Sequence, residues 1–123
     1  MENIVKYNLQ RYIDGYELDY EIALLELKEG YKRSHWMWYI FPQIVGLGHS
    51  RTSVFYAIPD IGEAKAYMQN PVLGAHMKEL CEALLSLETN DAVEVFDWPD
   101  DMKLKSSMTL FAILSIVVSI NPK

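Results

Sequence analysis

Cysteine is almost absent from the chain, which limits the chemistry that its side chains can carry. Cys81 is the one cysteine among 123 residues, so no internal disulfide can form and metal sites built on paired cysteines are excluded. A reducing cytoplasm fits this composition. Cys81 also falls on the apolar stripe of a predicted helix, so we expect a buried core residue rather than a nucleophile.

Basic residues are also few. Lys and Arg number 11 against 17 Asp and Glu, which gives a formal net charge of -6. Nucleic-acid affinity comes largely from Lys and Arg displacing counterions, so a nucleic acid is a disfavoured partner. The densest basic stretch, residues 28–33, is short and is interrupted by Glu29, a pattern that is typical of a solvated helix end.

No apolar run in the sequence is long enough to span a bilayer. The longest, residues 108–120, falls short of the roughly 20 residues that a membrane helix needs, and a buried terminal helix is the better interpretation. The N-terminal sequence MENIVKYNLQ lacks the charged and apolar regions of a secretory signal. These features favour a cytoplasmic protein with no membrane partner.

Apolar residues make up 50% of the chain and aromatic residues 12%, which is ample material for a hydrophobic core. The length of 123 residues fits one domain, so we expect residues 1–123 to form a single unit. The first long segment has apolar residues at helical spacings of three and four, and Gly30 is placed to end the helix. Those residues are Leu9, Tyr12, Ile13, Tyr16, Tyr20, Ala23, Leu24 and Leu27.

Capping signals predict further helices in the second half of the chain. Asp60, with Glu63 three residues later, is typical of a capping box that opens a helix through Gln69. Asn70 and Pro71 supply an N-cap and a first-turn proline for the next helix. A short helix is expected over residues 91–96, then a turn at residues 97–100 and a last helix from Asp100 or Asp101. The fold class is therefore mainly α, a compact single-domain helical bundle.

The middle of the chain is less regular. Ser34 is a plausible N-cap, and residues 35–41 predict either a short buried helix or a strand that ends before Pro42. Residues 43–53 contain Gly46 and Gly48 and predict a glycine-containing loop. Residues 54–58 are the most β-like run, although one short run does not make a sheet.

No standard catalytic or metal-binding motif is present, and we expect neither a metal nor a cofactor. The three histidines have no spacing that supports a metal site, and His49 and His76 are expected at the surface. Two segments, residues 32–43 and 100–111, interleave polar side chains with bulky apolar ones. A concave site with a few placed hydrogen bonds requires this combination, so these segments are the candidates for a binding site.

Several strings in the chain together resemble the bacterial DUF1810 family, a domain of unknown function. They are HWMWYIFPQ at 35–43, GLG at 46–48 with Ser50, YAI at 56–58, EA at 63–64, PVLG at 71–74, DDMK at 100–103 and SSMTLF at 106–111. The resemblance spans most of the chain and implies a mainly helical fold, but it supplies no established activity. Some relatives carry the label calpastatin, which nothing in this sequence supports. Relatives continue into another helix after the last string, so we expect a C-terminus that is shortened here.

The leading hypothesis is a domain that binds a small molecule or a nucleotide-like ligand between residues 32–50 and the start of the last helix. Lys32 would neutralise an anionic group, and Trp36 or Trp38 would supply an apolar wall. The remaining candidates for orienting the ligand are Ser34, Gln43, Ser50, Lys103 and Ser106. Each has a plainer interpretation: the tryptophans as core residues, Gln43 in a simple turn, and the serines bonded to backbone or packed between helices.

Two alternatives remain open from the sequence. In the first alternative, the chain is a hydrolase or transferase that acts on a nucleotide-derived substrate. His35 would be the general acid or base, and Asp100 would orient His35 or a water. His35 is equally well explained as a helix-start residue held by a backbone partner. Otherwise the chain is a structural or interaction protein whose aromatic face binds a protein partner or its own copy. An apolar surface left uncovered by the short C-terminus would favour such self-association.

Overall fold

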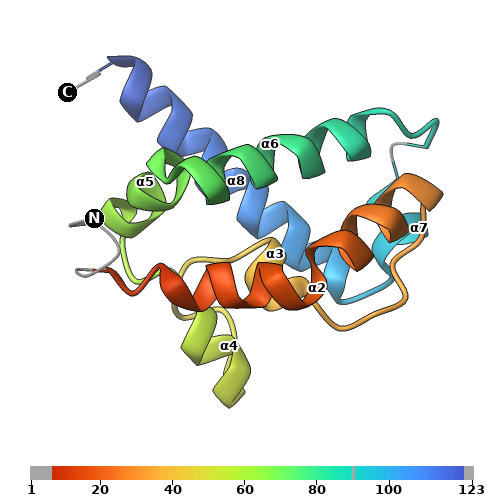
Figure 1. Cartoon of the computed structure of the whole chain (residues 1–123), viewed down its shortest axis with the longest axis horizontal. Coiled ribbons are helices and arrows are strands. Elements are labelled where there is room, and N and C mark those ends of the chain that lie inside the picture. The colour runs from red at the N-terminus through yellow and green to blue at the C-terminus, as the bar shows by residue number, and fades with distance from the viewer. Residues whose placement is uncertain (1–6, 90, 121–123) are drawn as a thin grey trace.

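The computed structural model describes residues 7–89 and 91–120, and over these residues the chain forms a bundle of helices with no β-strand (Figure 1). The helices are α2 (Gln10–Glu29), α3 (Met37–Ile40), α4 (Arg51–Tyr56), α5 (Ile61–Gln69), α6 (Pro71–Leu85), α7 (Ala92–Phe96) and α8 (Asp100–Ile120). The predicted mainly α, single-domain bundle is confirmed. No helix within the described part of the chain is both long and apolar enough to cross a membrane.

Helix α2 forms where the apolar spacing predicted it, and it ends at Gly30. Gly30 adopts a left-handed conformation with φ of 87°, and its N–H donates to the carbonyl oxygens of Glu26 and Leu27. The buried face of α2, which includes Tyr12, Tyr16 and Ala23, packs mainly against α6 and α3. In Figure 1, α2 and α6 lie one below the other across the molecule.

Helices α5 and α6 begin at the caps that the sequence predicts. The side chain of Asp60 accepts the N–H of Glu63, and that of Asn70 accepts the N–H groups of Val72 and Leu73. Helix α5 packs on both α6 and α8. The ring of Tyr67 is fully buried at the centre of this packing. Cys81 is half-buried on α6, with its thiol 4.0 Å from the sulfur of Met108.

The middle of the chain differs from two expectations. Ser34 does not cap a helix, because α3 begins after Trp36 and no side chain caps it. The β-like interpretation of residues 54–58 is wrong for its first part, since Val54–Tyr56 belongs to α4. The side chain of Ser50 accepts the N–H of Ser53, and this cap starts the helix ahead of the apolar run. Ile58 instead forms an isolated bridge with Ile44.

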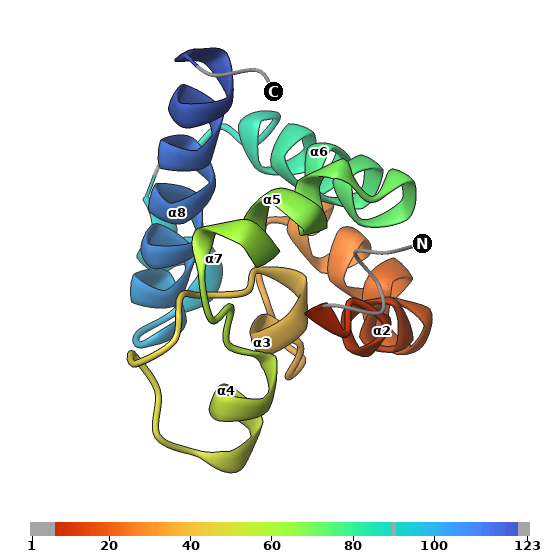
Figure 2. The same cartoon turned by 90° about the vertical axis from the view of Figure 1, so that its left-hand side faces the viewer.

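Helices α7 and α8 are joined by a tight turn. Helix α7 forms within the predicted range of residues 91–96, and the side chain of Asp91 caps it by accepting the N–H of Val93. The turn contains a cis peptide bond between Trp98 and Pro99, and α8 starts directly after it at Asp100. Helix α7 packs on α8, and an ion pair between Lys32 and Asp100 joins the segment that follows α2 to the start of α8. Figure 2 shows α8 along one side of the bundle and α2 on the other.

Candidate functional site

The two segments that the sequence singled out meet around a hollow of about 510 Å³. One wall comes from the segment between α2 and α3 together with α3, and the other from the α7–α8 turn and the first turn of α8. The hollow is lined by Tyr31, Lys32, Arg33, His35, Met37, Trp38, Phe96, Asp97, Trp98, Pro99, Asp100 and Lys103. Five of the residues that the sequence predicted, Lys32, His35, Trp38, Asp100 and Lys103, therefore line one hollow.

A charged triad connects the two walls. The Nζ of Lys32 lies 2.7 Å from Oδ2 of Asp100, and the Nζ of Lys103 lies 3.3 Å from Oδ1 of the same carboxylate. The Lys32 side chain is only 7% exposed, whereas Lys103 is 27% exposed. Two ammonium groups share a single carboxylate, so the triad carries an excess positive charge within a chain of net charge -6.

Aromatic rings line the same hollow as this triad. Trp98 is 76% exposed and Tyr31 is 40% exposed, so both rings present apolar surface to the solvent in the hollow. The Lys103 ammonium lies 5.6 Å from the centroid of the Trp38 ring, a cation–π distance. The hydroxyl of Tyr31 donates to Oδ2 of Asp97 at 2.7 Å, which ties the two walls together a second time.

Glu26, near the end of α2, holds one wall in shape. Its carboxylate accepts the backbone N–H groups of Arg33 and Ser34 at 2.7 and 3.0 Å, the Ser34 hydroxyl at 2.5 Å and the indole N–H of Trp36 at 3.0 Å. Burial alone would raise the pKa of Glu26, but these hydrogen bonds outweigh it and lower the pKa. The sequence patterns did not single out this residue. The sequence does contain one indication of its role: Glu26 follows Ala23 by three residues, which puts a carboxylate on the buried side of α2.

The structure does not bring the other predicted residues to the hollow, which corrects their proposed placement. Trp36 is fully buried and bonded to Glu26, and Ser34 is bonded to the same carboxylate. The other three lie elsewhere: Gln43 lines a separate hollow of about 10 Å³, Ser50 caps α4, and Ser106 lies further along α8, outside the lining of the large hollow.

His35 and Asp100 both line the hollow, but they do not form a pair. Within residues 7–89 and 91–120, no hydrogen bond or ion pair joins them, and both oxygens of Asp100 face lysines instead. The backbone oxygen of His35 accepts the Tyr39 hydroxyl at 3.5 Å. The enzyme hypothesis gave Asp100 the role of orienting His35 or a water, and in the part of the chain that the structure describes Asp100 makes no contact that orients His35. The catalytic assignment stays a hypothesis.

Residues from the α7–α8 turn complete the hollow, although their sequence predicted only a turn. They are Asp97, Trp98 and Pro99. The sequence does offer one indication: a tryptophan lies between turn-forming residues, which favours a ring at the surface of the protein. Within the described part of the chain, no group of His, Cys, Asp and Glu side chains could hold a metal ion.

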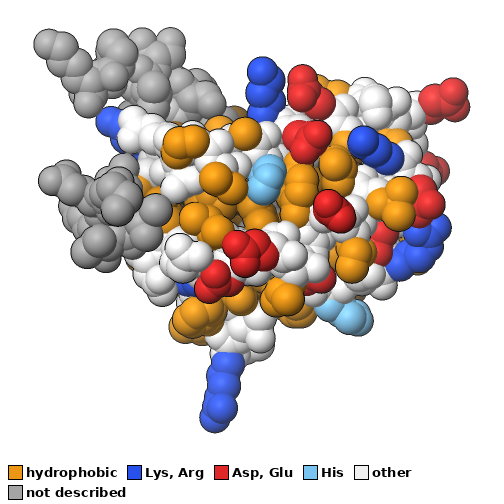
Figure 3. Space-filling view, in the orientation of Figure 1, with side chains coloured by type: hydrophobic (Ala, Val, Ile, Leu, Met, Phe, Trp, Pro, Cys, Tyr) orange, Lys and Arg blue, Asp and Glu red, His pale blue; other side chains and the backbone are white. Residues whose placement is uncertain are grey.

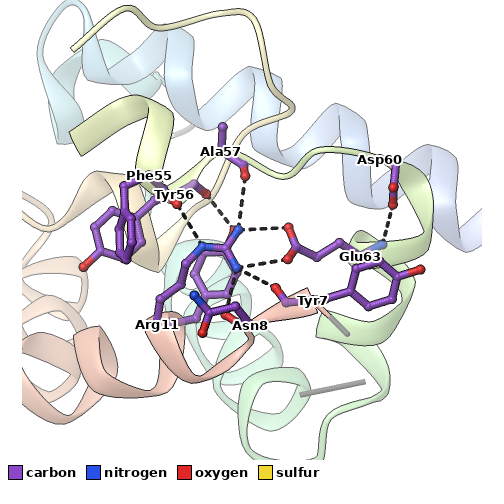
Figure 4. Close-up of polar contacts among 9 residues, drawn as sticks. Tyr7, Asn8, Arg11, Phe55, Tyr56, Ala57, Asp60 and Glu63 are labelled. Carbon is purple, nitrogen blue, oxygen red and sulfur yellow. Dashed lines mark hydrogen bonds and ion pairs between the residues drawn. The ribbon is translucent and has the colours of Figure 1, made fainter. Parts of the chain in front are cut away.

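A second cluster of charged residues, around Arg11 and Glu63, is structural. Figure 4 shows the Arg11 guanidinium enclosed by hydrogen-bond acceptors, with the Glu63 carboxylate on one side. Its Nε donates to the carbonyl oxygen of Phe55, and its terminal nitrogens donate to Glu63 and to the carbonyl oxygens of Tyr7, Asn8 and Ala57. Every nitrogen is already bonded within the protein, so this cluster has no donor left for a ligand.

Comparisons with known proteins agree with the fold. A family model described as "Protein of unknown function (DUF1810)" matches residues 6–119. A crystal structure of the conserved hypothetical protein Rv1873 from Mycobacterium tuberculosis is 40% identical in sequence and superposes with a TM-score of 0.86. The match covers 89% of this chain and 78% of that one. A search of curated proteins finds no match.

Proposed function

Because the chain belongs to the DUF1810 family, which is described as being of unknown function, we propose a function from the geometry of the hollow. We infer that it binds a small molecule that carries both an anionic group and a planar group, as a nucleotide does. The observation that carries the proposal is that two lysines on one carboxylate share a hollow of about 510 Å³ with exposed aromatic rings.

The lysines supply the binding site for the anionic group. An ammonium group has three donors, and Lys32 and Lys103 each direct one toward Asp100. Donors therefore remain on each lysine for a phosphate or carboxylate of the ligand. Since Lys32 is mostly shielded from water, its attraction for an anion is screened less than that of a fully exposed lysine. Asp100 fixes both ammonium groups in place before a ligand arrives.

The aromatic rings supply the site for the planar group. Stacking of a base on an aromatic side chain contributes about 1–3 kcal/mol, and Trp98, Tyr31 and Trp38 all line the hollow. The volume lies within the range of roughly 300–1,000 Å³ that is usual for small-molecule sites. Trp98 is 76% exposed, so covering its ring with a ligand removes apolar surface from water.

The test is a binding screen with AMP, ADP, ribose 5-phosphate, adenosine and inorganic phosphate. Thermal shift identifies stabilising compounds, because a ligand that binds only the folded state raises its apparent stability, and calorimetry then gives affinities. We expect AMP or ADP to bind more tightly than adenosine or phosphate alone. Failure of every compound in the panel to stabilise the protein would overturn the nucleotide-like assignment.

Two pairs of variants locate the site. Lys103→Ala is expected to weaken binding about tenfold, the equivalent of roughly 1.4 kcal/mol, whereas Lys105→Ala, an exposed lysine on the same helix, leaves it unchanged. Trp98→Ala removes a stacking surface from the hollow and is expected to weaken binding. Its control is Phe55→Ala, which removes a ring that is 55% exposed on α4, outside the hollow, and leaves binding unchanged. Equal affinity of Lys103→Ala and the parent protein would place the ligand elsewhere.

A further inference from the structure

A second hollow, of about 530 Å³, lies between α2 and α6 and differs in character from the first. Its rim carries apolar side chains that are exposed to water: Leu18 at 76%, Ile22 at 46% and Val72 at 45%. Figure 3 shows hydrophobic side chains gathered over this region around a histidine, with acidic side chains beside them. We call this surface the α2–α6 groove.

The apolar residues of α2 form a continuous stripe. Leu18, Ile22 and Leu25 are separated by four and three residues, so they share one face of the helix, and Leu25 is 58% exposed. Single exposed apolar residues are normal on a protein surface, but an aligned stripe beside a hollow is typical of an interaction site. An amphipathic helix reaches such a groove with anchors at matching intervals of three and four residues.

Packed rings form the floor of the groove. The His76 ring stacks on Tyr20 with a centroid distance of 3.8 Å and an interplanar angle of 19°, and it lies 4.9 Å from the ring of Tyr16. The Tyr20 hydroxyl donates to the carboxylate of Glu79. These contacts join α2 to α6 across the floor, so the groove is formed before any partner arrives.

The charge around the groove selects the kind of partner. Glu17 and Glu21 line it, both exposed, and neither takes part in an ion pair within the described residues. A second copy docking through the same face would bring these acidic residues together, and like charges repel. A basic partner is attracted instead.

We propose that the α2–α6 groove is a docking surface for an amphipathic helical segment of another protein, with apolar anchors on one face and Lys or Arg beside them. The apolar anchors cover Leu18 and Ile22, and the basic residues lie against Glu17 and Glu21. Electrostatic attraction raises the association rate and favours basic partners over acidic ones. Burial of apolar surface supplies most of the binding free energy.

The test uses three synthetic helical peptides of equal length and the full chain. One has leucines on a single face and lysines beside them, the second has the same leucines with glutamates, and the third has the composition of the first in a scrambled order without an apolar face. Binding is followed by fluorescence anisotropy, and the site is located by amide chemical shifts in NMR. We expect the basic amphipathic peptide to bind at α2 and α6, at least tenfold more tightly than the other two.

Surface variants decide the charge argument. Glu17→Lys with Glu21→Lys is expected to reverse the preference, so that the acidic peptide binds better. Leu18→Ser weakens binding of the basic peptide several-fold, and the matched control Leu85→Ser, at a residue of α6 that is 84% exposed and outside the groove, leaves it unchanged. Equal binding of the basic and acidic peptides, no binding of either, or a dimer that is lost in Leu18→Ser would each overturn the proposal.

Discussion

The guanidinium of Arg11 binds both carboxylate oxygens of Glu63, at 3.0 and 2.9 Å, although the two residues lie 52 positions apart in the sequence. Both side chains are buried, with exposed fractions of 8% and 1%. Burial alone would lower the pKa of Arg11, but hydrogen bonding and attraction by Glu63 raise it. The pair thus ties the start of α2 to α5, and Arg11 also binds the backbone on both sides of Tyr56.

Breaking this pair is expected to be costly. Arg11→Met leaves a buried carboxylate without its partner, and we expect the free energy of unfolding to fall by about 3–5 kcal/mol. The double variant Arg11→Met/Glu63→Leu should lose less than the sum of the single variants. Chemical denaturation measures all of them. Arg33→Ala is the matched control, because Arg33 and Glu29 are 56% and 46% exposed and ion pairs at the surface contribute little to stability. Equal losses at the two arginines would mean that burial does not set the strength of the Arg11 pair.

The carboxylate of Glu26 is expected to make stability depend on pH. Its pKa is lowered in the folded protein, so its contribution is complete above the ordinary glutamate pKa of about 4.3 and is lost as the pH falls through the lower folded-state value. Glu26→Gln weakens four charge-assisted hydrogen bonds and should cost about 1–3 kcal/mol near pH 7.

The measurement for Glu26 is urea denaturation of the parent protein and of Glu26→Gln between pH 7 and pH 3. The difference between the two free energies should shrink as the pH falls below the ordinary glutamate range. Since Glu26 shapes one wall of the hollow through Arg33 and Ser34, the variant should also weaken ligand binding. A difference that stays constant over the whole pH range would show that the charge of Glu26 is not what stabilises the wall.

Local signals made most of the fold predictable. Asp60, Asn70 and Asp91 each bond to a backbone N–H within three residues, so the start of each helix is determined by neighbouring sequence. The interpretation of residues 54–58 failed because the apolar run favours a strand, while the cap at Ser50 begins a helix that continues through Tyr56. Here the cap that precedes the run determined its secondary structure, and the β-propensity of the run did not.

The candidate site was predictable only in outline. The alternation of polar and aromatic residues indicated the two segments that meet, because both features are visible in the sequence. Distant partners decided the rest: Ser34 bonds to Glu26 rather than capping a helix, and the Trp36 indole bonds to the same carboxylate. A contact between residues in different elements depends on how those elements pack, and the spacing of one segment does not contain that information.

Gly74 is expected to resist replacement by alanine. Alanine in place of glycine inside a helix usually stabilises it by up to about 1 kcal/mol. At this position a Cβ would lie 2.4 Å from the carbonyl oxygen of Met68, a backbone atom of α5 that cannot move aside cheaply. Gly74→Ala should therefore destabilise the protein by about 1–3 kcal/mol in thermal or chemical denaturation. The control Leu85→Ala, at an exposed residue of the same helix, should change stability by less than about 0.5 kcal/mol.

His76 is expected to titrate below the ordinary pH range of a histidine. Burial against Tyr16 and Tyr20 lowers its pKa, and the nearby carboxylate of Glu79 opposes this only in part. Its Nδ1 is buried with no hydrogen-bond partner in the described structure, so the folded state favours the neutral ring. The unfolded chain binds the proton more tightly, and the stability that His76 contributes is lost as the pH falls below about 6.5 toward the folded-state pKa.

NMR titration of the ring protons should give His76 a midpoint below about 6.5, and His76→Gln should remove this part of the acid destabilisation. A midpoint at or above the value of a free histidine would mean that the ring is stacked in its charged form.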